Sequence, residues 1–156
     1  MLCTLADLKT CKAEKLPLQR LLGIDLGDKT VGLSLSDTTW SIASPYQTLI
    51  RSSDKQAITG LQNVIKEFSI AAIVMGYPLN MNGSAGPQSQ KVTQFSEKLL
   101  ISCDIPLLLW DERLSTAAVT RTLITADVSR KKQKKAVDKL AASFILQGVL
   151  DSLKPY

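Results

Sequence analysis

Short apolar runs separated by turn residues predict five strands. Residues 21–27 form one such run, and in 30–37 apolar and small residues alternate after a Gly27-Asp28 turn, which predicts a hairpin. Residues 45–50 extend this pair into a three-stranded meander. The continuous apolar run 70–76 is typical of a strand covered on both faces, and 105–110 forms the fifth strand.

Apolar residues at helical spacing alternate with the later strands. Residues 53–68 repeat apolar positions every 3.6 residues behind a Ser53 cap, and 87–101 begin at Pro87, which suits a first helical turn. Two more helices are expected, one from Ser115 or Thr116 to about 125 and a long one over 133–153. The order β-β-β-α-β-α-β-α-α predicts an α/β fold, with a five-stranded mixed sheet flanked by helices.

Length and composition indicate a protein of one domain. We expect residues 20–156 to form that domain and residues 1–19 to be an N-terminal extension, either a short helix or a loose segment. No stretch approaches the ~18 apolar residues of a membrane span, and no secretory signal is recognised. Three cysteines without a CxxC spacing indicate a reduced, cytoplasmic protein with no disulfide framework.

The chain contains no histidine, which limits its chemistry. Ser-His-Asp and Cys-His catalysis, histidine-ligated zinc and HExxH sites are all excluded. An enzyme with this sequence must therefore rely on carboxylates, lysines, arginines, hydroxyl groups and a metal ion.

Acidic residues from three parts of the chain are expected to meet at one edge of the sheet. Asp25 lies inside the first strand and Asp111 and Glu112 follow the fifth, and ligands of open α/β sheets bind outside the carboxyl ends of strands. Asp138 lies on the otherwise apolar face of the last helix. Taken singly, Asp25 can be an acceptor of backbone hydrogen bonds and Asp138 half of a structural salt bridge.

Taken together, these carboxylates indicate a metal site. Carboxylates that meet without cations repel one another, and Mg²⁺ prefers oxygen ligands of this kind. Two such ions about 3.5–4 Å apart can clamp the attacking and leaving oxygens of a phosphoryl transfer. The sequence therefore predicts a metal-dependent nuclease or phosphotransferase.

A basic cluster lies just before Asp138 and suggests a polyanionic partner. Cations at the start of a helix oppose the helix dipole, and a nucleic-acid backbone would offset that repulsion. The net charge of +5 is consistent with such a partner, although a solvated helix end is the simpler explanation. The basic cluster consists of Arg130, Lys131, Lys132, Lys134 and Lys135.

The loop over residues 78–86 is a second candidate for substrate binding. It follows a strand and precedes a helix, and its backbone amides and Asn80 can grip a phosphate or serve only as a connector. Base-specific recognition is not visible in the sequence. The aromatic residues available for stacking on a base are Trp40, Tyr46, Tyr77 and Trp110.

Four segments, in order along 21–153, resemble the motifs of one known family. Residues 23–27 read GIDLG, 76–84 read GYPLNMNGS, 111–116 read DERLST and 135–142 read KAVDKLAA. They resemble the YqgF-type family, the bacterial Holliday-junction-resolvase-like proteins also described as pre-16S rRNA nucleases. Asp28, Asn82 and the longer N-terminal extension depart from the family pattern, and Asp28 adds a negative charge near the expected site.

The resemblance implies an RNase H-like fold and a phosphodiesterase that depends on Mg²⁺ or Mn²⁺. Its acidic site would map to Asp25, Asp111, Glu112 and Asp138, with Asp25, Asp138 and either Glu112 or Asp111 on the metal. Arg113 would pair with a carboxylate or contact a phosphate.

The expected function is hydrolysis of RNA phosphodiester bonds in the 5′-end maturation of pre-16S rRNA. One alternative is a resolvase of four-way DNA junctions, which favours a symmetric dimer, so that both a monomer and a homodimer are open. Another is a non-catalytic nucleic-acid-binding module. The first strand also resembles the phosphate-binding hairpin of the actin, hexokinase and Hsp70 group, but those proteins pair two such domains and 156 residues are too few.

Overall fold

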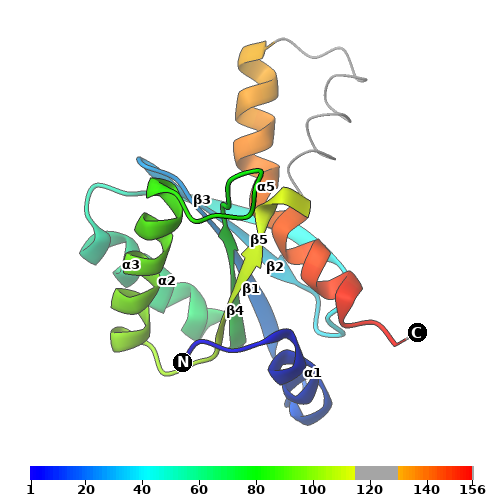
Figure 1. The fold of residues 1–156 in the computed structure, drawn as a ribbon. Coiled ribbons are helices and arrows are strands. Elements are labelled where there is room, and N and C mark those ends of the chain that lie inside the picture. The colour runs from blue at the N-terminus through cyan, green and yellow to red at the C-terminus, as the bar shows by residue number, and fades with distance from the viewer. Residues whose placement is uncertain (115–129, 156) are drawn as a thin grey trace.

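The five predicted strands form a single mixed sheet in the order β3-β2-β1-β4-β5 (Figure 1). The first three strands pair antiparallel, whereas β1 pairs parallel with β4 and β4 with β5. The computed structural model describes the backbone of residues 1–114 and 130–155, and the side chains of 1–113 and 140–155. The strands are β1 (Arg20–Leu26), β2 (Thr30–Ser36), β3 (Ala43–Ile50), β4 (Ile70–Tyr77) and β5 (Leu107–Asp111). The predicted five-stranded mixed sheet is thus confirmed.

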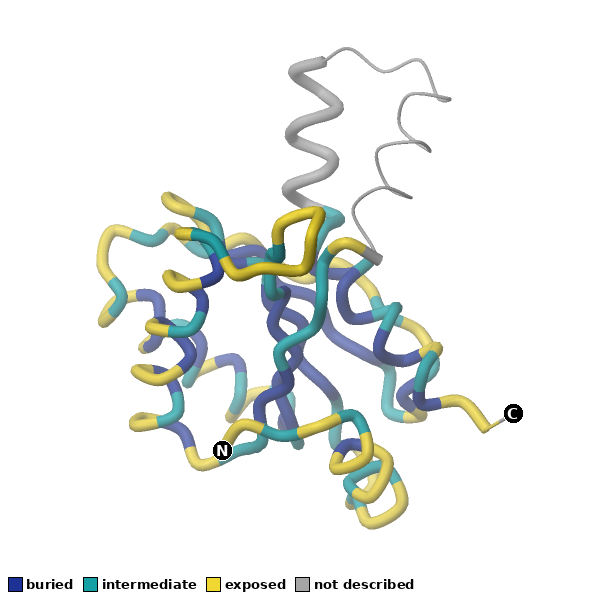
Figure 2. Tube along the Cα trace, in the orientation of Figure 1, coloured by how far each residue is buried: buried dark blue, intermediate teal, exposed yellow. Residues whose placement is uncertain are grey.

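Helices cover both faces of the sheet, as Figures 1 and 2 show. On one face, α2 (Asp54–Glu67) and α3 (Pro87–Ser102) enclose a core that includes Leu61 and Phe95. On the other face, α1 (Leu5–Glu14) and α5 (Arg130–Ser152) enclose a second core that includes Trp40. No helix in the described part of the chain combines the length and the apolar character that a membrane crossing needs.

Most predicted boundaries are confirmed to within a few residues. Ser53 caps α2 as predicted, since its hydroxyl accepts a hydrogen bond from the amide of Gln56 at 3.2 Å. The fifth strand begins at Leu107 rather than 105 and includes Asp111, because Pro106 has no N–H group to donate to a ladder. The helix predicted from Ser115 or Thr116 lies outside the described residues.

The N-terminal segment packs against the sheet. Leu2 forms a parallel bridge with Leu107, and the amide of Cys3 donates to the Leu107 carbonyl at 2.9 Å. A capping box formed by Thr4 and Asp7 then starts α1. Leu8 of this helix is completely buried in the core beneath α5. The N-terminal segment thus contains the short helix that was one of its two expected forms. The boundary between residues 1–19 and the domain stays a prediction.

Small residues let α5 lie directly on the sheet. A Cβ atom at Gly23 of β1 would lie 2.2 Å from Ser34 Oγ and 2.9 Å from the Ala142 carbonyl oxygen. The Ser34 hydroxyl donates to that same carbonyl at 2.7 Å. We call Gly23, Ser34 and Ala142 the α5 seat. It fixes the position of the helix that carries Asp138 and the basic cluster.

Candidate active site

The sheet brings Asp25 and Glu112 to the same edge. Asp25 is the penultimate residue of β1, and Glu112 directly follows β5 in a short 3-10 helix, η1 (Glu112–Leu114). Both strands run parallel to β4, which lies between them, so all three strands end at one edge. The expectation that these acidic residues share a sheet edge is therefore met.

Gly76 makes room for the Glu112 side chain across β4. A Cβ atom at Gly76 would lie 2.2 Å from Glu112 Oε1 and 2.6 Å from Ile145 Cδ1. The Glu112 carboxylate consequently lies over the backbone of β4, with α5 beside it. Gly76 had no predicted role, although a glycine within a strand often marks a close approach of this kind.

The Asp25 and Glu112 side chains contact each other. Burial raises the pKa of Glu112 from 4.5 to about 7, assisted by the negative charge of Asp25, a hydrogen bond with Asp25 and the charge of Asp111. Two carboxyl groups so close cannot both carry a full charge without compensation. A shared proton or a bound cation would relieve this repulsion at neutral pH. An oxygen-only pair of this type suits a hard divalent ion such as Mg²⁺.

Asp111 is engaged differently from its neighbour Glu112. Its carboxylate accepts hydrogen bonds from the Arg113 guanidinium, from Nε at 2.9 Å and from Nη2 at 2.6 Å. It also accepts a bond from the Arg113 amide at 3.0 Å. The hydrogen bonds of this side chain lower the pKa of Asp111. Arg113 was predicted to pair with a carboxylate or to contact a phosphate, and here it pairs with the Asp111 carboxylate. Because of this pairing, Asp111 is less available to a metal ion than Glu112.

Asp138 lies on α5, one helical turn before Ala142 of the α5 seat. Its side chain and those of the basic cluster lie outside the described residues. The backbone of this part of α5 extends past the edge where β4 and β5 end (Figure 1). Among the described side chains, no group of three Asp, Glu, His or Cys residues forms a metal site, so a third ligand would have to come from elsewhere, as predicted for Asp138.

The polar side chains of the loop between β4 and α3 form hydrogen bonds with one another. The Asn80 amide group donates to Ser84 Oγ at 3.0 Å, and Asn82 Oδ1 accepts from Ser84 Oγ at 2.6 Å. These bonds give the loop a defined shape. The predicted contact of Asn80 with nucleic acid stays a prediction.

Asp28, the extra negative charge, lies 3.2 Å from the ammonium group of Lys91, and both side chains are exposed.

The prediction that Trp40 is available for stacking is wrong. The side chain is completely buried, and its indole N–H donates to the Gln19 carbonyl at 3.0 Å. Tyr46 packs edge-on against Phe68 with ring centroids 5.0 Å apart, and Tyr77 packs against the core beneath α2 and α3. These rings serve mainly to pack the protein.

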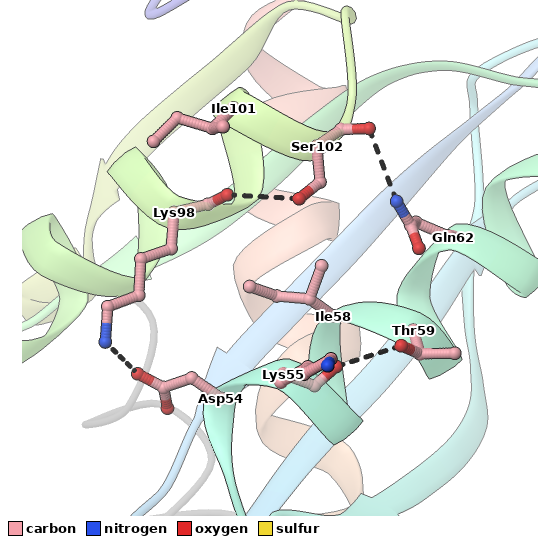
Figure 3. Close-up of a pocket in the computed structure, with 8 residues that line it drawn as sticks. All are labelled: Asp54, Lys55, Ile58, Thr59, Gln62, Lys98, Ile101 and Ser102. Atoms are coloured by element: carbon pink, nitrogen blue, oxygen red, sulfur yellow. Dashed lines mark hydrogen bonds and ion pairs between the residues drawn. The ribbon is translucent and has the colours of Figure 1, made fainter.

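An open groove between α2 and α3 lies apart from these acidic residues (Figure 3). Its carboxylate, Asp54, is 2.8 Å from Lys98 Nζ and 2.9 Å from Arg51 Nη2. The carboxylate is therefore neutralised by two cations. The groove therefore lacks the contact between two carboxyl groups that distinguishes the Asp25–Glu112 pair.

Comparison with known proteins gives consistent matches over most of the chain. A family model described as RuvX, Holliday junction resolvase, matches residues 19–152. A Beijerinckia indica protein named "Putative pre-16S rRNA nuclease" is 53% identical over 137 residues, which is 88% of this chain and 83% of the relative. A protein of the same name from Thermoanaerobacter pseudethanolicus is 48% identical over 136 residues, 86% of this chain and 98% of the relative. Among solved structures, T. thermophilus RuvC in complex with Holliday junction substrate matches with a TM-score of 0.49 and 12% identity, over 86% of this chain and 96% of that one.

Proposed function

The chain belongs to the RuvX family, which is described as Holliday junction resolvase, and from this premise we propose that it is a nuclease of pre-16S rRNA 5′-end maturation. The relationship predicted from the four sequence motifs is confirmed. The observed strand order and the mixed sheet are those of the RNase H-like fold that the relationship implies. The RNA substrate is inferred from the names of relatives that are about half identical to this chain.

The contact between Asp25 and Glu112 carries the proposal. A partly buried pair of carboxyl groups in contact is unfavourable for stability when both are charged, and a shared proton or a cation relieves that cost. Here the pair lies where three parallel strands end, and Gly76 opens the space that Glu112 occupies. Such an arrangement is expected of a site that binds a divalent cation.

Asp25, Glu112 and Asp138 would hold one or two Mg²⁺ or Mn²⁺ ions. A bound ion would neutralise charge on the phosphate and lower the pKa of the attacking water. Glu112 would lose its proton as the cation binds, since its pKa is about 7 without one. Asp111 would act as a positioning residue, because it fixes the guanidinium of Arg113 for contact with a phosphate. The basic cluster would bind the nucleic-acid backbone.

The test is cleavage of a precursor 16S rRNA fragment by single variants. Asp25→Asn, Glu112→Gln and Asp138→Asn should each reduce kcat/KM at least about 100-fold, as for loss of one element of electrostatic stabilisation. Asp54→Asn is the matched control, because it neutralises a carboxylate on α2 that already pairs with Lys98 and Arg51. It should stay within a few-fold of the parent. Undiminished Mg²⁺-dependent cleavage by an Asp25→Asn, Asp138→Asn double variant would refute the assignment.

A resolvase of branched DNA is the second candidate, favoured by the description of the family model. It would use the same acidic residues on a different substrate. A four-way DNA junction and the RNA fragment should be offered to the same preparation under the same Mg²⁺ concentration. Symmetric cuts in the junction, by a dimer and without RNA cleavage, would replace the first candidate. Binding that ignores Mg²⁺ and cleaves neither substrate would indicate a non-catalytic binding module.

A further inference from the structure

The loop between β4 and α3 forms a small, well-bonded hairpin. Leu79 and Ala85 face each other in an antiparallel bridge, and the Asn80 amide donates to the Ser84 carbonyl at 2.9 Å. The Gly83 amide then donates to the Asn80 carbonyl at 2.8 Å, closing the turn. We call residues 79–85 the β4–α3 hairpin. The positive φ of Gly83, 84°, suits a residue without a Cβ atom.

Met81 lies at the tip of this hairpin and is 95% exposed. No other large hydrophobic residue in the described part of the chain has such a high exposed fraction. Residues 80–85 of the hairpin are exposed and appear in Figure 2 as a yellow loop. A single exposed apolar side chain is common on protein surfaces, so the significance of Met81 depends on what lies beside it.

The hairpin lies beside the candidate active site. A Cβ atom at Gly83 would lie 3.6 Å from Arg113 Nη1, so the tip of the hairpin lies beside the arginine that Asp111 holds. In Figure 1 the hairpin and η1 lie next to each other at the edge where β4 and β5 end. A nucleic-acid strand bound at Arg113 would therefore pass close to Met81.

Methionine has the chemistry for contact with bases. Its side chain is unbranched and flexible, and its polarizable sulfur packs well against aromatic rings. Proteins that bend or open nucleic acids insert apolar side chains, methionine included, between neighbouring bases. Of the four aromatic candidates, Trp40 is buried, Tyr77 and Trp110 are partly buried against the two cores, and Tyr46 packs edge-on against Phe68, whereas Met81 is 95% exposed.

We propose that Met81 is a wedge that enters between two bases of the nucleic-acid substrate next to the cleaved bond. This inference rests on the proposed nuclease function. The hydrogen bonds within the hairpin hold the tip in place, so that the wedge separates the bases while Arg113 contacts the adjacent phosphate. The wedge would favour substrates whose bases unstack easily, such as single strands and the branch points of folded RNA.

The test uses short RNAs from the 5′ precursor of 16S rRNA, each with one 2-aminopurine at a different position. Fluorescence of this base rises when it is unstacked. With Ca²⁺ in place of Mg²⁺ to suppress cleavage, the parent protein should brighten the probe several-fold at one or two neighbouring positions. Met81→Ala should abolish the rise and lower kcat/KM about 10-fold or more. Met81→Leu should retain both.

Controls separate the wedge from general effects. Ile101→Ala removes another highly exposed apolar side chain, on α3 and lining the groove of Figure 3, and should change neither measurement. The salt dependence of binding should be the same for Met81→Ala and the parent, since phosphate contacts are untouched. An equal rise with Met81→Ala, or no rise at any position with the parent, overturns the proposal.

The wedge and the nuclease function can fail separately. Asp25→Asn should lose cleavage but keep the fluorescence rise. If the parent cleaves none of the substrates yet the rise still depends on Met81, the nuclease assignment fails and the wedge stands. If the parent cleaves RNA and Met81→Ala matches it in both measurements, the wedge fails and the nuclease assignment stands.

Discussion

Gly76→Ala tests whether the position of the Glu112 carboxylate governs activity. The new Cβ atom would lie 2.2 Å from Glu112 Oε1, whereas real Cβ atoms essentially never approach closer than 3.0 Å. The carboxylate must therefore move by about 0.8 Å or more, the difference between these distances. Displacements of about 1 Å at a reacting centre cost on the order of 100-fold in rate. We expect kcat/KM for the precursor RNA to fall by that factor.

The same change should affect stability much less than activity. Extra atoms in a packed region typically cost about 1–3 kcal/mol, so the variant should remain folded at room temperature. Urea unfolding gives the stability, and calorimetric titration with Mn²⁺ in the absence of substrate should show weaker binding. Gly60→Ala on α2 is the matched control, because its Cβ atom would meet the end of the flexible Leu49 side chain at 3.1 Å. A Gly76→Ala protein with parental activity and Mn²⁺ affinity would refute the reasoning.

Three further predictions concern stability. The pKa of Glu112 is about 7 in the folded protein and 4.5 ordinarily. The protonated side chain therefore contributes fully to the free energy of unfolding below about pH 4.5, and this contribution is lost as the pH rises to about 7. In EDTA, the unfolding free energy of the parent should fall by about 2 kcal/mol between about pH 4.5 and pH 8, and Glu112→Gln should abolish this fall. An equal fall in the variant would contradict the burial of Glu112 beside Asp25. Gly23→Ala would place a Cβ atom 2.2 Å from Ser34 Oγ and 2.9 Å from the Ala142 carbonyl oxygen, and should lower the urea midpoint by the equivalent of about 1–3 kcal/mol. Leu8→Ala empties a completely buried position of α1 and should cost about 2–5 kcal/mol, measured by thermal melting; an unchanged melting temperature would mean that α1 does not stabilise the domain.

The sheet was predictable because its strands are apolar runs whose pattern does not depend on distant residues. Residues 70–76 have apolar or small side chains throughout, and the observed strand is buried along most of its length. The start of β5 was less predictable, since Ile105 and Pro106 are apolar yet precede the ladder. Apolar character alone does not distinguish a strand from the segment that leads into it.

The candidate site was predictable as a location but not as a set of contacts. Parallel strands bring Asp25 and the Asp111–Glu112 pair to one edge, which follows from topology. The choice between the two neighbours depends on Arg113, whose guanidinium engages Asp111 through a turn that propensities do not specify. The burial of Trp40 was missed for a similar reason, because its indole partner is the distant Gln19 carbonyl.

The α5 seat determines which parts of this protein can be altered for new substrates. The β4–α3 hairpin extends from the sheet edge, and its residues 80–85 are exposed, so this sequence can be varied in a library without disturbing the core. Gly23 and Ser34 cannot be varied in the same way, because both contact the Ala142 carbonyl of α5. A larger side chain there would displace α5, together with Asp138 and the basic cluster. Directed evolution of a nuclease with altered sequence preference should therefore randomise the hairpin and hold these two positions constant.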